Sequence, residues 1–227
     1  MKNIILQHYT GALGQLEEYS IENISNYAKV VGADYKFLEG QVFRPHLTTH
    51  CQKLFMLDES FDEYDNVMML DIDMFITSYE TQNVFDVPGI GLYEDTQRRL
   101  HLNMQSGFPG VSTAVNPYWG GAIYKMNRST RTTLRSAIPE LSGLSGGGRD
   151  NPYMHYDEGI MHMLACKTNF NAPTNYLPRK WCYCSFLPGV AADAGFIHIR
   201  TKIRPEGPKR TKMENLRELV SKGIINI

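Results

Sequence analysis

The apolar positions near the start of the chain follow a strand, helix and strand pattern. Asn3–Gln7 is a short apolar run that fits a buried strand. Leu16–Val31 then places its apolar residues at close to helical spacing, and Gly32 follows as a helix end. Asp34–Leu38 reads as a second strand. Two strands joined by a helix are typical of a parallel sheet, so the sequence predicts an α/β fold.

A second helical stretch and a very apolar strand come next. Leu47–Phe61 carries apolar residues at helical spacing, which predicts a second helix. Val67–Leu70 is apolar on both faces, as in a central strand of a parallel sheet. This strand ends at the acidic triplet Asp71–Asp73, and another apolar stretch, Met74–Ile76, follows directly. The triplet therefore comes at the carboxyl end of a buried strand, where open α/β sheets bind ligands.

The second half of the chain has a weaker pattern. Two glycine-containing stretches without periodicity predict loops, Arg98–Pro117 and Ser142–Arg149. The remaining predicted elements are a strand over Tyr118–Asn127, a helix over His155–Cys166, a strand over Gly195–Ile199, and a final helix that begins at the capping box Thr211–Glu214 and ends at Gly223. No repeat or linker divides the chain, so we expect one domain.

Composition limits the classes of function. The chain has 227 residues, 42% of them hydrophobic, which suffices for one medium domain with a sizeable core. Its net charge of -1 gives no electrostatic indication of a nucleic-acid partner. The apolar run Ile4–Leu6 is too short for a signal peptide, and no stretch approaches the length of a membrane span. We therefore expect a cytoplasmic enzyme, or a domain of a longer protein, with its four cysteines reduced.

Asp71 and Asp73 are the strongest candidates for chemistry. Two carboxylates at this spacing after a buried strand can approach one cation, and their oxygens suit hard ions such as Mg²⁺ or Mn²⁺. Such an ion neutralises the charge that develops on a diphosphate leaving group. Acidic triplets also occur by chance in exposed turns, but the apolar strand before this one favours the metal interpretation.

Four segments, in the correct order, resemble the GT-A glycosyltransferases and most closely the glycogenin-like retaining group. They are similar to that family's basic helix with strand and D-x-D, its F-N-G-G strand, its D-Q-G-L segment and its H-x-x-G-x-x-K-P segment. The matching segments are Lys53–Ile76, Asn116–Ile123, Asp157–Ile160 and His198–Pro205. Small domains of this kind resemble bacterial glycan-synthesis enzymes and those of large DNA viruses of algae.

The resemblance implies an α/β, Rossmann-like GT-A fold. Its central sheet would be mixed but mostly parallel, flanked by helices, in a single domain over 1–227. Residues 1–76 would form the nucleotide-binding half that ends in the D-x-D. Residues 77–205 would form the half that receives the acceptor and the donor sugar, and 206–227 would carry the C-terminal helix.

The same resemblance implies a cofactor site. Asp71, Asp73 and His198 would bind Mn²⁺ or Mg²⁺, since a neutral imidazole can complete an oxygen-rich shell. Lys202 and Arg204 would neutralise the donor diphosphate. The alternatives are a structural histidine at a strand end and a solvated basic tail, because further basic residues follow as far as Lys212.

Other residues are implied for donor binding and catalysis. Tyr9 would stack on the base, although a core tyrosine fits its pattern nearly as well. Asp157 and Glu158 would lie beside the anomeric carbon as the catalytic pair, or would simply favour a helix N-terminus. The remaining implied donor-binding residues are Thr10, Lys53, Ile72, Gly120 and Gly121.

The sequence also departs from the family pattern. Glu158 stands where the family usually has Gln, Thr201 replaces Gly, and Arg204 replaces Lys. Trp119 takes the place of the usual Asn before Gly-Gly, and Glu206 that of a Trp. Because the regions of Trp119 and Glu158 line the sugar pocket in relatives, the donor sugar is left open.

The function implied is transfer of a hexose or deoxyhexose from a UDP-sugar to an acceptor hydroxyl on a glycan, with retention. Two alternatives are left open. A metal-dependent nucleotidyltransferase or nucleotide-sugar phosphohydrolase would also use paired aspartates, but the basic, glycine-rich loop expected of the former is missing after the first strand. A non-catalytic carbohydrate-binding module would use aromatic residues alone. The acceptor and the oligomeric state are left open.

Overall fold

The structure is a computed structural model, and its central feature is a five-stranded sheet. The residues that it describes are 1–45, 47–92, 119–138, 157–170, 176–184, 193–201 and 210–227. The strand order is β2-β1-β3-β6-β5. The strands are β1 (Asn3–Tyr9), β2 (Asp34–Glu39), β3 (Asn66–Leu70), β5 (Gly91–Leu92) and β6 (Gly120–Asn127).

Four of these strands share one direction. β1 pairs in parallel with both β2 and β3, whereas β6 pairs antiparallel with β3 and with β5. The strand β6 is therefore the reversed one, and its beginning lies at the edge where β1 and β3 end. The predicted mixed, mostly parallel sheet is confirmed.

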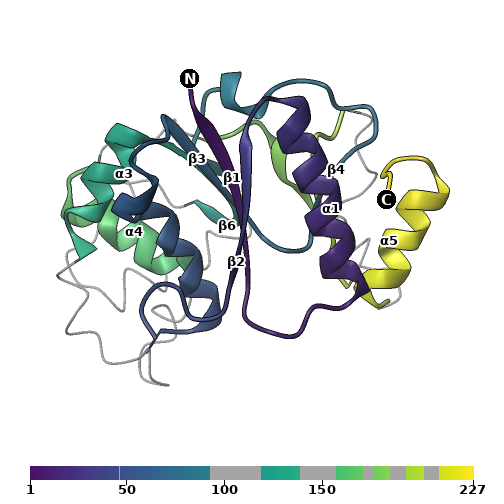
Figure 1. Cartoon of the computed structure of the whole chain (residues 1–227), viewed down its shortest axis with the longest axis horizontal. Helices are drawn as coiled ribbons and strands as arrows, with labels where there is room; N and C mark the ends of the chain where they lie inside the picture. The colour runs from purple at the N-terminus through teal and green to yellow at the C-terminus, as the bar shows by residue number, and fades with distance from the viewer. Residues whose placement is uncertain (46, 93–118, 139–156, 171–175, 185–192, 202–209) are drawn as a thin grey trace.

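Helices cover both faces of this sheet (Figure 1). α1 (Gln15–Val30) lies on one face, and η1 (Thr49–Leu57), α3 (Arg128–Arg135) and α4 (Asp157–Lys167) lie on the other. Alternate residues of a strand point to opposite faces. Ile4 and Leu6 accordingly join the core under η1 and α4, whereas Ile5 joins the core under α1. Burial on both faces explains why the central strands are continuously apolar.

A second, three-stranded sheet brings the late histidine to the end of β3. It consists of β4 (Met74–Ile76), β8 (Phe196–His198) and β7 (Tyr183–Cys184), with β8 in the middle. β8 runs antiparallel to β4, with His198 opposite Met74. A third apolar cluster joins this sheet to α5 (Lys212–Ser221), so the C-terminal helix is packed beside the same region (Figure 1).

The predicted helix over Leu47–Phe61 is present as two 3₁₀ helices. η1 ends at Leu57, and η2 (Glu59–Phe61) follows after Asp58. Asp58 has an extended backbone, and its side chain accepts a hydrogen bond from Ser60 N at 2.9 Å. An aspartate that caps a new helix in this way interrupts the preceding one. The part of the chain that the structure describes has two further 3₁₀ helices, η3 (Val84–Asp86) and η7 (Arg179–Cys182).

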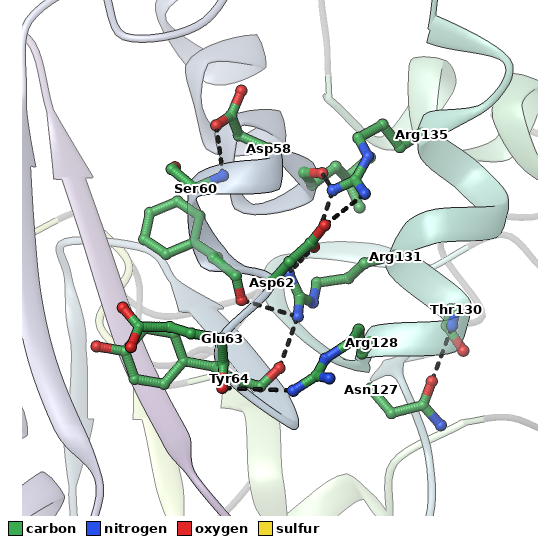
Figure 2. Close-up of polar contacts among 12 residues, drawn as sticks. Asp58, Ser60, Asp62, Glu63, Tyr64, Asn127, Arg128, Thr130, Arg131 and Arg135 are labelled. Carbon is green, nitrogen blue, oxygen red and sulfur yellow. Dashed lines mark hydrogen bonds and ion pairs between the residues drawn. The ribbon is translucent and has the colours of Figure 1, made fainter.

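Three arginines of α3 hold the chain that leads from η1 to β3 (Figure 2). Arg131 is fully buried and donates to the carbonyl oxygens of Phe61 and Tyr64 at 3.1 and 2.8 Å. Arg135 binds both carboxylate oxygens of Asp62, at 3.0 and 2.7 Å. The third, Arg128, contacts Asp65 at 3.3 Å near the protein surface. The turn before β3 is thereby fixed to the helix that follows β6.

The sequence pattern did not predict α3, because Leu134 is the one apolar residue in its Arg- and Thr-rich sequence. One local signal was present, since the side chain of Asn127 accepts a hydrogen bond from Thr130 N at 2.8 Å as an N-cap. The final helix is confirmed with its capping box, in which Thr211 and Glu214 satisfy each other's backbone N–H groups.

Part of the predicted structure after residue 93 lies within the described residues and part lies outside them. The predicted loops Arg98–Pro117 and Ser142–Arg149 lie outside the described residues, and the proposed division into two halves stays a prediction. The predicted helix over His155–Cys166 is observed from Asp157 onward, within the described range. Among the described residues, no helix combines the length and apolar character that crossing a membrane requires.

Candidate metal centre and surrounding active site

Asp71, Asp73 and His198 converge on one point. Asp71 and Asp73 follow the end of β3, and His198 ends β8, which pairs with the next strand, β4. His198 Nε2 lies 3.1 Å from Asp73 Oδ1 and 3.8 Å from Asp71 Oδ2. One ligand atom from each residue fits within a span of 4.8 Å. Two carboxylates and an imidazole can hold a divalent ion, and this donor set suits Mn²⁺ or Mg²⁺.

Two nitrogen groups lie against the carboxylate of Asp73. Its side chain is 8% exposed, and it lies against His198 on one oxygen and Lys212 Nζ on the other, at 2.5 Å. Burial by itself would raise the pKa of this carboxyl, but His198 and Lys212 hold the pKa well below its ordinary value. Asp73 is therefore ionised and ready to bind a metal ion at any physiological pH.

The backbone of the acidic triplet is anchored by the central sheet. The amide of Asp71 donates to Ala122 O at 3.0 Å, which extends the pairing of β3 with β6. The Asp71 carbonyl accepts from Gln7 Nε2 at 3.1 Å. Gln7 is buried within β1, and its amide also contacts Ser20 and Tyr35. This polar residue in an apolar strand thus fixes the turn that carries the metal ligands.

Lys53 is the buried cation of the site. Its ammonium group contacts Asp71 Oδ1 at 2.6 Å, Gly121 O at 2.6 Å and Asp157 Oδ2 at 3.2 Å. Burial alone would lower the pKa of Lys53, but Asp157 and Asp71 outweigh it and hold the pKa above the ordinary range. The lysine therefore stays charged and joins the metal ligand Asp71 to the acidic start of α4.

Asp157 and Glu158 form the other side of this network. Asp157 is buried and accepts from Tyr124 Oη at 2.7 Å, in addition to its contact with Lys53. Glu158 accepts from the amide of Gly121 at 2.8 Å. Burial raises the pKa of both carboxyls, that of Glu158 to about 7, with the charge of Asp157 as the second cause for Glu158. The glutamate is therefore close to half protonated near neutral pH.

Gly121 has no room for a side chain. A Cβ atom at this position would lie 2.5 Å from Asp157 Oδ2, which is shorter than any normal contact. The backbone of Gly121 also uses both polar groups, because its amide donates to Glu158 and its carbonyl accepts from Lys53. The second glycine of the Gly-Gly pair is thus required by the close approach of β6 and α4.

The other residues implied for donor binding lie at the same edge of the sheet. Tyr9 ends β1 and Thr10 follows it, and both are half-buried. The pairing of Gln7 with Leu70 places this end of β1 beside the acidic triplet. Ile72 lies within the triplet and is half-buried, and Gly120 is buried at the start of β6.

The predicted phosphate-binding residues Lys202 and Arg204 lie outside the described residues. The two ends of that segment are nevertheless placed, because Arg210 N donates to Thr201 O at 2.8 Å. Thr201 and Arg210, which flank residues 202–209, therefore lie side by side, and Thr201 comes three residues after His198.

Three residues of the site were not singled out as functional from the sequence: Gln7, Tyr124 and Lys212. Gln7 could have been found as a polar residue in an apolar strand. The contacts of Tyr124 with Asp157 and of Lys212 with Asp73 join residues 33 and 139 positions apart, and no local pattern indicates them.

Comparison with known proteins shows the fold. No family model matches the sequence, and no curated protein matches it. Among solved structures, the chain is similar to a glycosyltransferase involved in the glycosylation of the major capsid of PBCV-1. The alignment covers 97% of this chain and 100% of that one, with a TM-score of 0.55 and 12% sequence identity. The chain therefore has a glycosyltransferase fold of the GT-A-like type, as predicted, whereas the glycogenin-like subgroup stays a prediction.

Proposed function

We propose that this protein is a metal-dependent glycosyltransferase that moves a hexose or deoxyhexose from a UDP-sugar to an acceptor hydroxyl on a glycan. The observation that carries this proposal is the convergence of Asp71, Asp73 and His198 at the carboxyl end of β3. The glycosyltransferase fold supports the same activity. A divalent ion bound by these three residues, Mn²⁺ or Mg²⁺, would neutralise the charge of the leaving UDP.

The residues around the metal ligands have separate tasks in this proposal. Lys53 keeps Asp71 in place and offsets the charge of Asp157, so that three acidic groups can lie close together in a partly buried site. Tyr9 and Thr10 contact the base and ribose at the end of β1, and Ile72 supports them from the triplet. Lys202 and Arg204 bind the diphosphate by charge-assisted hydrogen bonds.

Glu158 is the better placed of the two proposed catalytic acids. Asp157 already contacts both Tyr124 and Lys53, which suits a positioning role. Glu158 makes one described hydrogen bond, to the amide of Gly121, and is partly exposed. A carboxylate here can act as a nucleophile or stabilise an oxocarbenium-like centre. Either role requires the ionised form, which a cation at the adjacent metal site favours.

A screen of nucleotide sugars with and without Mn²⁺ tests the activity, scored by hydrolysis of the donor and by thermal shift. A glycosyltransferase releases UDP slowly from its donor in the presence of Mn²⁺ and faster with an acceptor. Sugar binding without metal dependence would instead indicate a carbohydrate-binding module. Cleavage that leaves the sugar phosphate would indicate a phosphohydrolase. The Asp73→Ala protein is the control, because it should lose every metal-dependent signal.

We further propose that the reaction retains the anomeric configuration, on the basis of the glycogenin-like order of motifs. NMR of the product linkage tests this directly, and a product of opposite configuration to the donor would contradict it. The Glu158→Gln protein separates two retaining routes. A collapse of turnover with unchanged donor binding supports a nucleophilic or strongly electrostatic role. Near-normal turnover would exclude the nucleophile and favour a front-face route.

A further inference from the structure

Lys212 contacts the same carboxylate that the proposed metal ion would use. It is the first residue of α5, and its ammonium group lies 2.5 Å from Asp73 Oδ2. The other oxygen of Asp73 faces His198 Nε2 at 3.1 Å. Both oxygens of this carboxylate are thus occupied by positively charged or hydrogen-bonding nitrogen groups. A divalent ion that binds to Asp73 must approach a position beside an ammonium group.

We propose that Lys212 is an exchangeable counter-ion of Asp73: a bound divalent ion displaces its ammonium group, which then binds the diphosphate of the donor. The inference rests on the proposed function, since it takes Asp73 as a metal ligand. It adds a residue to the diphosphate site that lies ten positions beyond the motif lysine Lys202. It also couples the two binding events, because the metal both attracts the diphosphate and frees a cation for it.

Electrostatics supplies the force for the exchange. A doubly charged ion within about 5 Å of an ammonium group repels it even at the dielectric constant of water, by enough to shift an equilibrium roughly 15-fold. The lysine itself is 43% exposed, so its side chain can turn into solvent without leaving an unsatisfied group. The salt bridge that it gives up is therefore weak compared with a buried one.

The backbone around Lys212 is held, so the exchange needs only side-chain movement. The capping box of Thr211 and Glu214 fixes the first turn of α5. The side chain of Asn215 donates to Arg200 O, two residues beyond His198, at 2.5 Å. The start of α5 consequently stays beside the metal ligands whichever partner the lysine has. A flexible side chain on a fixed Cα suits transfer between two anionic partners a few ångströms apart.

Lys53 shows what a fixed counter-ion looks like at the same site. Its side chain is 7% exposed, and its ammonium contacts Asp71, Asp157 and Gly121 O. Its burial gives the ammonium group little access to solvent, and its removal would leave the buried carboxylate of Asp157 without this cation. The two lysines therefore differ in the property that exchange requires, which is access to solvent.

Chemical footprinting of the wild-type protein tests the proposal directly. An amine-acetylating reagent attacks only a deprotonated, accessible amine, so a lysine held by a carboxylate reacts slowly. We expect Mn²⁺ alone to raise the acetylation rate of Lys212 by roughly three- to tenfold, because repulsion by the ion outweighs the weak salt bridge between Lys212 and Asp73. Addition of UDP with Mn²⁺ should lower the rate again. Lys222, at the other end of α5 and paired with Glu218, is the internal control and should not respond.

Calorimetry of Lys212→Met and Lys222→Met gives a second measurement. Both variants remove one positive charge from the ends of α5, but only the first removes the contact with Asp73. We expect Lys212→Met to bind Mn²⁺ roughly three- to tenfold more tightly and to bind UDP with Mn²⁺ more weakly. Lys222→Met should match the wild type in both titrations.

The outcomes separate this inference from the proposed function. If Mn²⁺ binds to the wild type and not to Asp73→Ala, yet leaves the reactivity of Lys212 unchanged, then the counter-ion proposal is wrong and the metal centre stands. Weaker Mn²⁺ binding by Lys212→Met would show that the lysine supports the site only structurally, and would likewise overturn the proposal. If Mn²⁺ does not bind to the wild type at all, both proposals fail.

Discussion

Replacing Glu158 by glutamine should stabilise the metal-free protein above neutral pH. Glu158 is largely buried beside Asp157, and its pKa is raised from the ordinary 4.5 to about 7. The folded protein therefore holds a proton at pH values where the unfolded chain has lost it. As pH rises from about 4.5 through 7, this difference lowers the free energy of unfolding, and the loss is complete above pH 7. Glutamine keeps the acceptor oxygen for the Gly121 amide and removes the charge.

The magnitude follows from the two pKa values. A difference of this size is worth about 3 kcal/mol, which is an upper value because some hydration of the site persists. For a chain of this length, 3 kcal/mol corresponds to roughly 6–12 °C in the melting temperature. We therefore expect Glu158→Gln to be as stable as the wild type near pH 4.5 and more stable at pH 8, by about 1–3 kcal/mol.

Chemical denaturation at several pH values, in the presence of a chelator, measures this difference. Glu22→Gln is the matched control, because the side chain of Glu22 is exposed on α1. The control should show no pH-dependent gain. A Glu158→Gln protein that is equally or less stable than the wild type at pH 8 would refute the reasoning, because it would show that Glu158 is not held in an environment that disfavours its charge.

Four other substitutions test separate parts of the structure. Asp73→Ala should abolish Mn²⁺-dependent binding of UDP in calorimetry while circular dichroism shows an intact fold; unchanged affinity would remove Asp73 from the metal site. Gly121→Ala should lower the free energy of unfolding by about 1–3 kcal/mol, because its Cβ would meet the Asp157 carboxylate at 2.5 Å. Arg131→Met should cost about 2–4 kcal/mol, since it removes the charge-assisted hydrogen bonds of a buried guanidinium to Phe61 O and Tyr64 O. Arg128→Met, on the exposed side of α3, should cost under about 1 kcal/mol, and equal losses would contradict the role given to burial.

The sequence predicted the central sheet because its strands are apolar on both faces. Val67–Leu70 contributes alternately to the cores on the two sides of the sheet. Its continuous apolar pattern therefore indicated a strand that is buried on both faces. The start of α5 was equally predictable, because a capping box acts through residues three positions apart. By contrast, α3 is stabilised by arginine contacts to the turn before β3, and such contacts leave no apolar period in the sequence.

The candidate site was predictable in part for a similar reason. Asp71 and Asp73 follow a buried strand, and the end of such a strand is a defined place in an α/β fold. The pairing of β8 with β4 places His198 beside Asp71 and Asp73. Only the resemblance to a known family indicated beforehand that His198 belongs to this site. The contacts of Lys53 and Lys212 depend on how distant segments pack, which single-sequence patterns do not encode.

The reversed direction of β6 has a consequence for how enzymes of this shape can diverge. Since the start of β6 lies at the edge of the sheet that carries Asp71 and Asp73, residues inserted before Trp119 would lengthen the chain without changing the register of β1, β3 and β6. Lengthening a loop costs little, about 0.6 kcal/mol for each doubling. The chain between β5 and β6 can thus change in length while Asp71, Asp73 and His198 keep their positions.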